Sequence, residues 1–306
     1  MKNKLKIIIC FILPLFLILF VDFNAPTNTS SVESEVSQQF SLDFSNTDNL
    51  PLNFRKTSDL SNLKDKNLDL TGLDSLNISG SGEFTSLSLL KLKENLNTPP
   101  PIVIVDLRQE THGFINGNSV SDSNQYCNVG LTFNDISERE KQVLSNIPFG
   151  KSISLGNENH SLIPTLVETE ENLIRPNNLR YVRIPVKENG RPTDETVDRF
   201  VEYINTLKKD TWLHFHCKLG DERTTIFMSM YDMIKNSNNT ELKNILTRQE
   251  ALGGTNLLNL DEHDPKSIFI KNFYQYSRNA DFKISWSNWI KQNNIEPYNA
   301  ENELPK

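Results

Sequence analysis

A short apolar strand pattern that passes through a cysteine loop directly into a helical pattern is the feature that most constrains the fold. Residues 212–216 are apolar and aromatic, which predicts a strand buried on both faces. Residues 226–234 carry apolar side chains at spacings of three and four, which predicts a helix. The connecting loop contains Cys217 and, six positions later, Arg223. The sequence therefore predicts an α/β fold organised around this strand, loop and helix.

The cysteine loop, residues 217–223, has the features of an anion site that also carries a nucleophile. A loop that leads into a helix N-terminus turns several backbone N–H groups toward one point, and the helix dipole adds positive potential there. A phosphoryl group fits such a site, and Arg223 can bind two of its oxygens at once. The same potential favours a thiolate at Cys217. Covalent phosphoryl transfer through a thiophosphate requires this combination.

The neighbours of Cys217 favour this interpretation over a buried structural cysteine beside a surface arginine. His216 would help to fix the loop, and the Thr224 hydroxyl can hydrogen-bond the sulfur as it leaves. The residues between the cysteine and the arginine would line the phosphate site: Lys218, Leu219, Gly220, Asp221 and Glu222. Lys218 adds a cation there, Leu219 narrows the mouth, and Glu222 would oppose a phosphate unless its carboxylate points away.

A second buried strand begins at Ile102 and opens into a polar loop. Ligands bind beyond the carboxyl ends of strands in parallel α/β sheets. Charged side chains at alternate positions of this loop can share one side: Asp106, Arg108, Glu110 and His112. Two interpretations stay open. Either Arg108 or His112 lies beside the substrate, or the set forms a salt-bridged rim that supports the cysteine loop.

A third strand is predicted over residues 179–186, followed by a loop at 187–192 and a capped amphipathic helix from about 194 to 208. Because the cysteine strand comes next, these elements form a right-handed crossover. The loop at 187–192 therefore opens at the same sheet edge as Cys217, where a mobile general acid would lie.

Other elements are predicted from the same periodicities. A strand is expected near residues 76–84, helices over 86–96, 241–252 and 266–278, and a last short helix that carries Trp286 and Trp289. Between 114 and about 176 the pattern is weaker, and short apolar alternations indicate a few small strands of a β-rich subdomain.

The ends of the chain lie outside this domain. Lysines precede an apolar run over residues 7–21, which predicts a signal peptide or an uncleaved membrane anchor within residues 1–22. Residues 23–46 are polar and predict a flexible linker, and residues 294–306 a polar tail. We expect a protein that is exported, secreted or periplasmic, or anchored by its N-terminal segment; membrane contact is expected only through that segment.

Composition limits the expected partners. The net charge of −7 gives no indication of general nucleic-acid binding, so cations that handle a phosphorylated substrate must be concentrated locally. No cluster with metal-ligand spacing is visible in the sequence, and neither a metal nor another cofactor is expected. In an oxidising compartment Cys127 could pair with Cys217 and silence it; the alternative is that Cys127 is a half-buried free thiol.

The order His-Cys-x-x-Gly-x-x-Arg-Thr at residues 216–224 is the signature of cysteine-dependent phosphatases, and further motifs narrow the resemblance. They are Asn53-Phe54-Arg55, Asn77-Ile78-Ser79-Gly80-Ser81-Gly82, Val105-Asp106-Leu107-Arg108-Gln109-Glu110-Thr111-His112-Gly113-Phe114, Arg191-Pro192-Thr193, Asp198-Arg199-Phe200, Arg248-Gln249 with Gly253-Gly254, Phe273-Tyr274-Gln275-Tyr276 and Trp286-Ser287-x-Trp289. In this order, over about residues 53–290, they resemble the protein-tyrosine-phosphatase-like phytases, the cysteine phytases of bacteria.

The resemblance implies a cysteine-phosphatase α/β core, with a mixed central sheet flanked by helices and a small β-barrel-like subdomain. The domain would span residues 47–293, with the subdomain mainly within 47–75 and 114–178. It implies phosphomonoester hydrolysis through a cysteinyl phosphate, on inositol polyphosphates such as phytate. The residues that would bind this substrate outside the cysteine loop are Arg55, Asp106, Arg108 and His112, and Lys218 would join them from within it.

The general acid departs from the family pattern. The family has an Asp in the loop before the capped helix, and its place here is taken by Glu188, whose carboxyl lies one methylene further out. Asp194 is the alternative acid, or a helix-cap residue. Three other functions stay open: a protein-tyrosine or phosphoinositide phosphatase on the same core, a catalytically weakened module that binds phosphorylated ligands or phosphoproteins, and a rhodanese-type sulfurtransferase.

Overall fold

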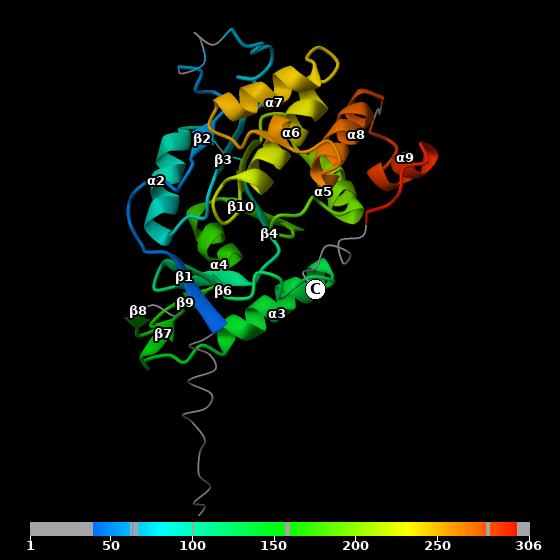
Figure 1. Ribbon diagram of the computed structural model, residues 1–306. Helices are drawn as coiled ribbons and strands as arrows, with labels where there is room; N and C mark the ends of the chain where they lie inside the picture. Colours follow the sequence, from blue (N-terminus) through cyan, green and yellow to red (C-terminus); the bar gives the residue numbers. More distant parts are fainter. Residues whose placement is uncertain are drawn as a thin grey trace, which may run out of the picture.

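A computed structural model describes residues 39–61, 63, 67–99, 101–156, 160–279 and 282–298 (Figure 1). The predicted signal segment at 1–22 and the first part of the predicted linker lie outside these residues, as do residues 299–306 of the predicted tail. Within the described part of the chain, no helix combines the length and the apolar character needed to cross a bilayer.

The central sheet has the strand order β10-β4-β11-β3-β2. Its strands are β2 (Arg55–Lys56), β3 (Ile78–Ser81), β4 (Ile102–Arg108), β10 (Arg180–Val186) and β11 (Trp212–His216). The first four in this order run parallel, and β2 is antiparallel to β3. The cysteine strand β11 lies between β4 and β3 and all five of its residues are buried, so the predicted strand and the mixed sheet are confirmed.

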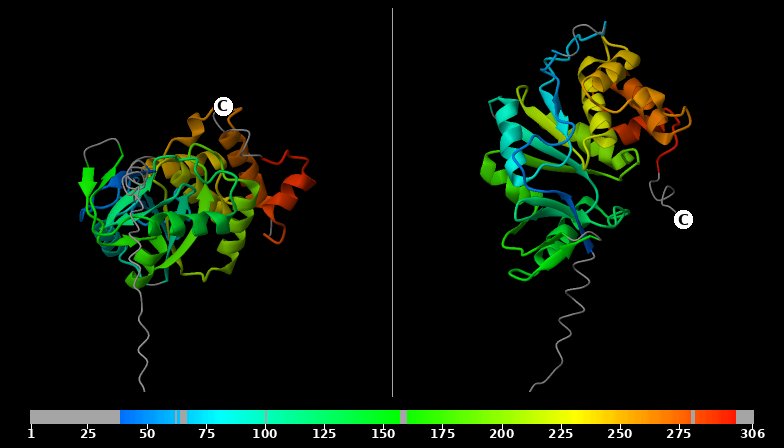
Figure 2. Two further views of the ribbon diagram at one scale, coloured as in Figure 1. Left: turned by 90° about the horizontal axis from the view of Figure 1, so that it is seen from below. Right: turned by 60° about the vertical axis from the view of Figure 1, so that its left-hand side comes forward.

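Helices cover both faces of this sheet. One face packs on α5 (Asp194–Thr206), α6 (Glu222–Asn236), α7 (Leu242–Ala251), α8 (Pro265–Asn279) and α9 (Trp286–Gln292), and the 3₁₀ turn Leu257–Asn259 joins this layer. The other face packs on α2 (Ser86–Leu96) and α4 (Glu170–Ile174), which the 3₁₀ turn Arg175–Asn177 follows. Figure 2 shows α2 in cyan across the sheet from the yellow-to-red helices.

The side chains of the strands explain these layers. Leu213 and Phe215 of β11 point into the cluster with α5, α6 and α8, whereas Trp212 points into the cluster with α2 and α4. Alternation along a strand sends neighbouring side chains to opposite faces, so a strand covered on both sides must be apolar throughout. The helices predicted near 86–96, 194–208, 241–252, 266–278 and at the two tryptophans are therefore confirmed, with ends that differ by at most two residues.

A second, smaller sheet has the antiparallel order β1-β6-β5-β9 and lies at the lower end of the molecule in Figure 1. Its strands are β1 (Phe40–Phe44), β5 (His112–Ile115), β6 (Asn118–Asp122) and β9 (Val167–Glu168), and a separate pair is formed by β7 (Ile153–Leu155) and β8 (His160–Leu162). Helix α3 (Phe133–Ser145) packs Leu144 against Phe40, Ile115 and Val120 of this sheet.

Two predictions about this smaller part were wrong, and a third is not confirmed. The linker predicted over 23–46 extends too far, because residues 40–44 form strand β1, whose Phe40 is buried in the small core. Residues 47–75 do not belong to the small sheet, since β2 pairs with β3 in the central sheet. The order of the four strands is open, so a barrel is not confirmed among the described residues.

Helix α3 was also missed in the region predicted to be β-rich. Its buried positions are Ile136, Glu140 and Leu144, spaced by four. A buried glutamate interrupts the apolar stripe, so the helical period is hidden in the sequence.

Candidate active site

The cysteine loop leaves β11 at His216 and enters α6 at Glu222. Gly220 adopts a φ of +78°, and a Cβ at this position would lie 2.3 Å from the backbone nitrogen of Gly82. Only glycine combines this left-handed conformation with such close packing. The loop therefore lies directly on the end of β3, and its shape is set by backbone contacts.

Arg55 holds the loop from the other side. Its guanidinium donates to the carbonyl oxygen of Gly220 at 2.8 Å and to the Thr225 hydroxyl at 3.1 Å. Burial lowers the pKa of Arg55 to about 10, although Cys217 and Asp221 act in the opposite direction. Asn53 donates to Asp221 Oδ1 and to the carbonyl oxygen of Leu219. The predicted substrate contact of Arg55 is not what the structure shows; the side chain is a support beneath the loop.

Cys217 lies at the base of the loop and is 3 % exposed. Its sulfur accepts a hydrogen bond from the Thr224 hydroxyl at 3.2 Å, as predicted from the position of Thr224 in the sequence. The 15-residue helix α6 starts directly after the loop, so its positive end faces the sulfur. A hydroxyl donor and a helix N-terminus are both groups that interact favourably with an anion.

Arg223 is fixed beside the loop by Glu110, one of the charged residues from which the sequence predicted a possible salt-bridged rim. Its Nη1 and Nη2 donate to the two Glu110 oxygens at 2.9 and 3.2 Å, and Nη1 also donates to the Val186 carbonyl at 3.1 Å. Burial alone would raise the pKa of Glu110, but Arg223 and Arg108 hold it well below its ordinary value. Burial likewise opposes the charge of Arg223, but Glu110 and Cys217 raise its pKa. The ion pair is therefore fully charged.

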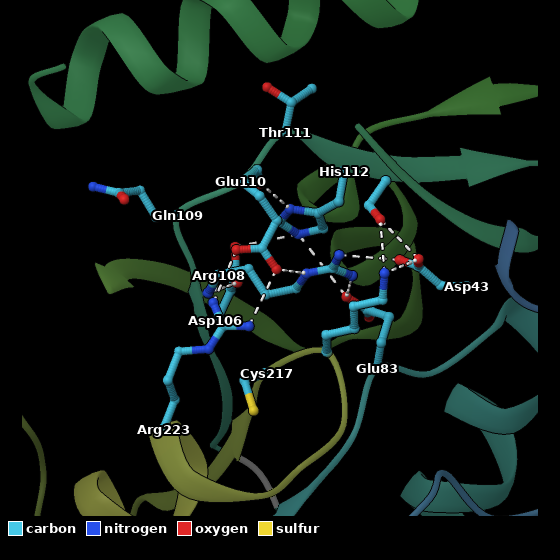
Figure 3. Close-up of polar contacts among 12 residues, drawn as sticks. Asp43, Glu83, Asp106, Arg108, Gln109, Glu110, Thr111, His112, Cys217 and Arg223 are labelled. Atoms are coloured by element: carbon cyan, nitrogen blue, oxygen red, sulfur yellow. Dashed lines mark hydrogen bonds and ion pairs between the residues drawn. The ribbon is translucent and has the colours of Figure 1, made fainter. Parts of the chain in front are cut away.

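Arg108 is completely buried and belongs to the support of the site. Its guanidinium donates to Glu110 at 2.8 Å, to Glu83 at 3.0 Å and to Asp43 at 3.0 Å (Figure 3). Figure 3 also shows Gln109 and Thr111 pointing away from this cluster, as the alternation predicted. Every nitrogen of the Arg108 guanidinium is engaged by a carboxylate, so the structure favours the salt-bridged rim over direct substrate contact.

Asp106 and His112 belong to the same buried rim. Asp106 accepts from the Tyr181 hydroxyl at 2.8 Å and pairs with Arg183 at 3.1 Å. His112 Nε2 lies 3.0 Å from Glu170, and burial lowers the pKa of His112 well below its ordinary value. Both side chains are buried and bound by these partners, so the structure favours the salt-bridged rim over direct substrate contact for them as well.

Glu170, the first residue of α4, joins the rim to the cysteine loop. One carboxyl oxygen lies 3.0 Å from His112 Nε2 and the other 2.8 Å from His216 Nε2. Burial and the charge of Asp106 raise the pKa of Glu170 well above its ordinary value. His216, which precedes Cys217 in the chain, is thereby held in place. Sequence reasoning missed Glu170 because it lies in a segment with no local motif.

Two buried triads bring possible metal-ligand atoms within 4.8 Å of one another: Glu83, His112 and Glu170, and Asp106, Glu170 and His216. The same side chains already bind one another and the guanidinium groups of Arg108 and Arg183. The positive charges of Arg108 and Arg183, which already contact these carboxyl groups, would repel a metal cation bound there. The arrangement fits a hydrogen-bonded network that shares protons better than a metal centre.

Glu83 gives this network a pH dependence. Burial and Glu170 raise the pKa of Glu83 from 4.5 to about 8. The folded protein then holds a proton that the unfolded chain releases above pH 4.5, so this contribution to stability is lost as the pH rises toward 8. In Glu83→Gln the side chain stays neutral at every pH. The melting temperature of this variant should therefore fall by about 5 °C less than that of the parent protein between pH 5 and pH 8.

Thermal unfolding of both proteins across this pH range measures that difference. Glu94→Gln on the exposed side of α2 is the matched control and should follow the parent protein. Parallel pH profiles for the parent and Glu83→Gln would show that Glu83 carries no proton in the folded state.

The remaining loop side chains point in different directions. Leu219 is 42 % exposed at the loop surface. Both carboxylate oxygens of Glu222 lie 3.0 Å from the Lys266 ammonium of α8, so this charge is paired outside the loop and Glu222 is not a substrate ligand. Lys218 extends toward the small sheet, where its ammonium lies 2.8 Å from Asp43.

The loop between β10 and α5 carries the candidate acids. It starts at Val186, whose carbonyl accepts from Arg223, so it borders the cysteine loop as predicted. Glu188 is half-buried and makes no hydrogen bond or ion pair with any residue in the described ranges. Asp194 instead accepts from Arg191, the Trp286 indole and the Tyr298 backbone, which assigns it to the packing of the C-terminal segment.

The thiols are separate in this structure. Cys127 and Cys217 are both free, and Cys127 is half-buried beside the backbone nitrogen of Thr111 at 3.5 Å. The pairing of Cys127 with Cys217 that the sequence left open is not formed in this structure.

Comparison with known proteins shows what this site is similar to. The sequence model PTPlike_phytase, described as "Inositol hexakisphosphate", matches residues 105–235, which include Glu110, Cys217 and Arg223. A protein tyrosine phosphatase-like phytase from Bdellovibrio bacteriovorus has 29% sequence identity and a TM-score of 0.68, over 82% of this chain and 95% of that one. The chain resembles the protein-tyrosine-phosphatase-like phytases in both sequence and fold.

Two other relatives are longer than the present chain. The tandemly repeated phytase from Mitsuokella multacida matches with a TM-score of 0.74 and 32% identity, over 83% of this chain and 49% of that one. The effector protein hopD2 of Pseudomonas syringae pv. tomato is 26% identical over 261 residues, which cover 77% of this chain and 56% of that protein. The chain therefore spans about half the length of these relatives.

Proposed function

We propose that this protein hydrolyses phosphomonoesters through a cysteinyl-phosphate intermediate and that its substrates are inositol polyphosphates. The observation that carries the proposal is the pairing of Arg223 with Glu110 beside the buried Cys217 sulfur at the start of α6. The family description adds the substrate class, and the Mitsuokella relative is described in complex with myo-inositol-(1,3,4,5)-tetrakisphosphate.

In the first step, the Cys217 thiolate attacks phosphorus and the bond to the leaving oxygen breaks. The backbone N–H groups of the cysteine loop and Arg223 bind the equatorial oxygens as charge redistributes among them. Glu110 keeps the guanidinium in one plane, so no reorganisation is needed during the reaction. The proton that the leaving alkoxide requires comes from Glu188.

In the second step, Glu188 as a carboxylate takes a proton from water, which attacks the thiophosphate and releases inorganic phosphate. The Thr224 hydroxyl, 3.2 Å from the sulfur, stabilises the thiolate that returns as the leaving group. Arg55, Arg108 and Glu170 hold the loop and its histidine and do not touch the reacting atoms.

Glu188→Gln is expected to lower kcat/KM for inositol hexakisphosphate by roughly tenfold to a thousandfold, because the alkoxide leaves unprotonated. For p-nitrophenyl phosphate, whose leaving group needs no proton, kcat/KM should change only severalfold. This ratio reports the steps up to the cysteinyl phosphate, so it separates the acid role of Glu188 from its role in the second step. Glu195→Gln, exposed on α5, is the matched control, and equal losses on both substrates would remove Glu188 from the role of acid.

The choice of substrate is tested by comparing phosphate release from inositol hexakisphosphate and from a phosphotyrosine peptide at equal enzyme concentration. The proposal expects the larger kcat/KM for the inositol phosphate. A preference for the peptide would identify a protein-tyrosine phosphatase on the same core. Calorimetric binding of inositol hexakisphosphate without phosphate release would identify a binding module, and turnover of thiosulfate with cyanide a sulfurtransferase.

A further inference from the structure

Strand β1 brings a carboxylate into the active site from far away in the sequence. β1 pairs with β6 in regular antiparallel register from Phe40 to Leu42, and the register then shifts between Leu42 and Phe44. Asp43 is the extra residue at this bulge. A bulge re-aims the side chain it carries, and the Asp43 carboxylate is fully buried between the small sheet and the cysteine loop.

The Asp43 carboxylate serves two cations at once. One oxygen lies 2.8 Å from the Lys218 ammonium and accepts from the Ser121 hydroxyl at 2.7 Å. The other oxygen accepts from Arg108 at 3.0 Å. Arg108 is fully buried, and an acidic side chain accepts from each of its guanidinium nitrogens. The position of Arg108 therefore does not depend on Lys218. Lys218 is the member of this group that keeps part of its side chain exposed.

Lys218 is held in place by Asp43 and Ser121 but keeps a hydrogen-bond donor for a ligand. Its ammonium has three donors, of which one faces Asp43 and a second faces Ser121 at 3.3 Å. Its side chain keeps 32 % of its surface exposed, directly after the nucleophile in the chain. One N–H therefore stays available at the mouth of the loop for an anionic group.

We propose that Asp43 is a positioning residue that fixes Lys218 at the mouth of the site, so that Lys218 binds a second phosphate of a polyphosphorylated substrate while the first occupies the cysteine loop. This inference rests on the proposed function and deepens it. A lysine without an anchor loses rotamer freedom each time it binds a ligand, and Asp43 removes that cost before the substrate arrives. The N-terminal strand thereby sets a preference for ligands with more than one phosphate.

The test compares Asp43→Asn, Lys218→Met and the double variant. The measured quantity is the ratio of kcat/KM for inositol hexakisphosphate to kcat/KM for p-nitrophenyl phosphate, which carries one phosphate. Each single variant should lower the ratio by about tenfold through KM for the polyphosphate, and the double variant should lower it no further. Asp48→Asn, on an exposed residue of the same segment, is the control and should leave the ratio unchanged.

A purely structural role for Asp43 through Arg108 predicts something else. The loss would then persist on top of Lys218→Met, or appear equally for both substrates, and either result overturns the inference. A ratio that stays the same or rises in Asp43→Asn overturns it too, because the carboxylate would then only compete with the substrate. Melting temperatures of all variants identify any that fail to fold, and Asp43→Ser then replaces Asp43→Asn.

Binding separates this inference from the proposed function. Calorimetry of inositol hexakisphosphate with Cys217→Ser protein, alone and combined with Asp43→Asn, requires no turnover. An affinity that falls about tenfold with Asp43→Asn supports the inference even if the parent protein releases no phosphate. An unchanged affinity overturns it even if the parent protein is an active phosphatase.

Discussion

Cys217→Ser is expected to lower phosphate release from inositol hexakisphosphate by at least about a thousandfold. A serine hydroxyl stays protonated near neutral pH and is a much weaker nucleophile than a thiolate. The Thr224 hydroxyl, 3.2 Å away, is a donor to the sulfur. Steady-state rates by a phosphate-detection assay measure the loss.

The control for this change is Cys127→Ser, since Cys127 is the other thiol in the described part of the chain. It should keep nearly the full rate. Cys217→Ser should also keep the melting temperature and bind the substrate, because the substitution removes no packing volume of note. Full activity of Cys217→Ser would exclude a covalent mechanism at this residue.

Arg223→Lys is expected to lower kcat by roughly a hundredfold to a thousandfold, comparable to the loss of other donors that stabilise a transition state. Lysine keeps the charge but has one point of contact, so it cannot pair with both oxygens of Glu110 and bind two phosphate oxygens in the same plane. The lost geometry should appear in kcat more than in KM, because the contacts strengthen as charge develops on the equatorial oxygens.

Two further variants make this test specific. Arg175→Lys, with 63 % of its side chain exposed, should behave like the parent protein. Glu110→Gln keeps Arg223 in the chain but removes the charge that fixes it, and it should reproduce part of the loss in kcat. If Arg223→Lys retained the parent kcat, planar recognition of the phosphoryl group would be excluded.

The central strand, the cysteine loop and the proximity of Thr224 to Cys217 could be predicted from the sequence because the features that specify them are local. The strand is apolar throughout, glycine stands at the position that needs a positive φ, and Cys217 and Arg223 lie in one short loop. Short-range spacing fixes such features before any tertiary contact forms.

The acidic residues that support the site could not be predicted from local sequence patterns. Asp43, Glu83 and Glu170 come from three separate segments and meet only when both sheets have formed. Charged residues at the edge of a sheet indicate an anion site, but they do not show which of them face the ligand. Arg55 and Arg108 therefore had the expected charge and location, yet they bind the loop and its rim.

The boundaries of the small sheet were predicted wrongly for a related reason. Residues 40–44 alternate apolar and polar side chains, but they follow a long polar stretch that dominates the local composition. The buried bulge at Asp43 is visible only once β6 is in place. Glu222 shows the opposite case: its charge beside the nucleophile looked unfavourable, and Lys266, 44 positions later in the chain, pairs with it.

Trapping the covalent intermediate tests the central claim most directly. The protein is mixed with inositol hexakisphosphate, quenched with acid within the first turnover and digested, and the peptide that contains position 217 is examined by mass spectrometry. We predict a phosphoryl group on the Cys217 sulfur that is absent in Cys217→Ser. Phosphate release that continues with no phosphoryl group on that peptide would contradict the account.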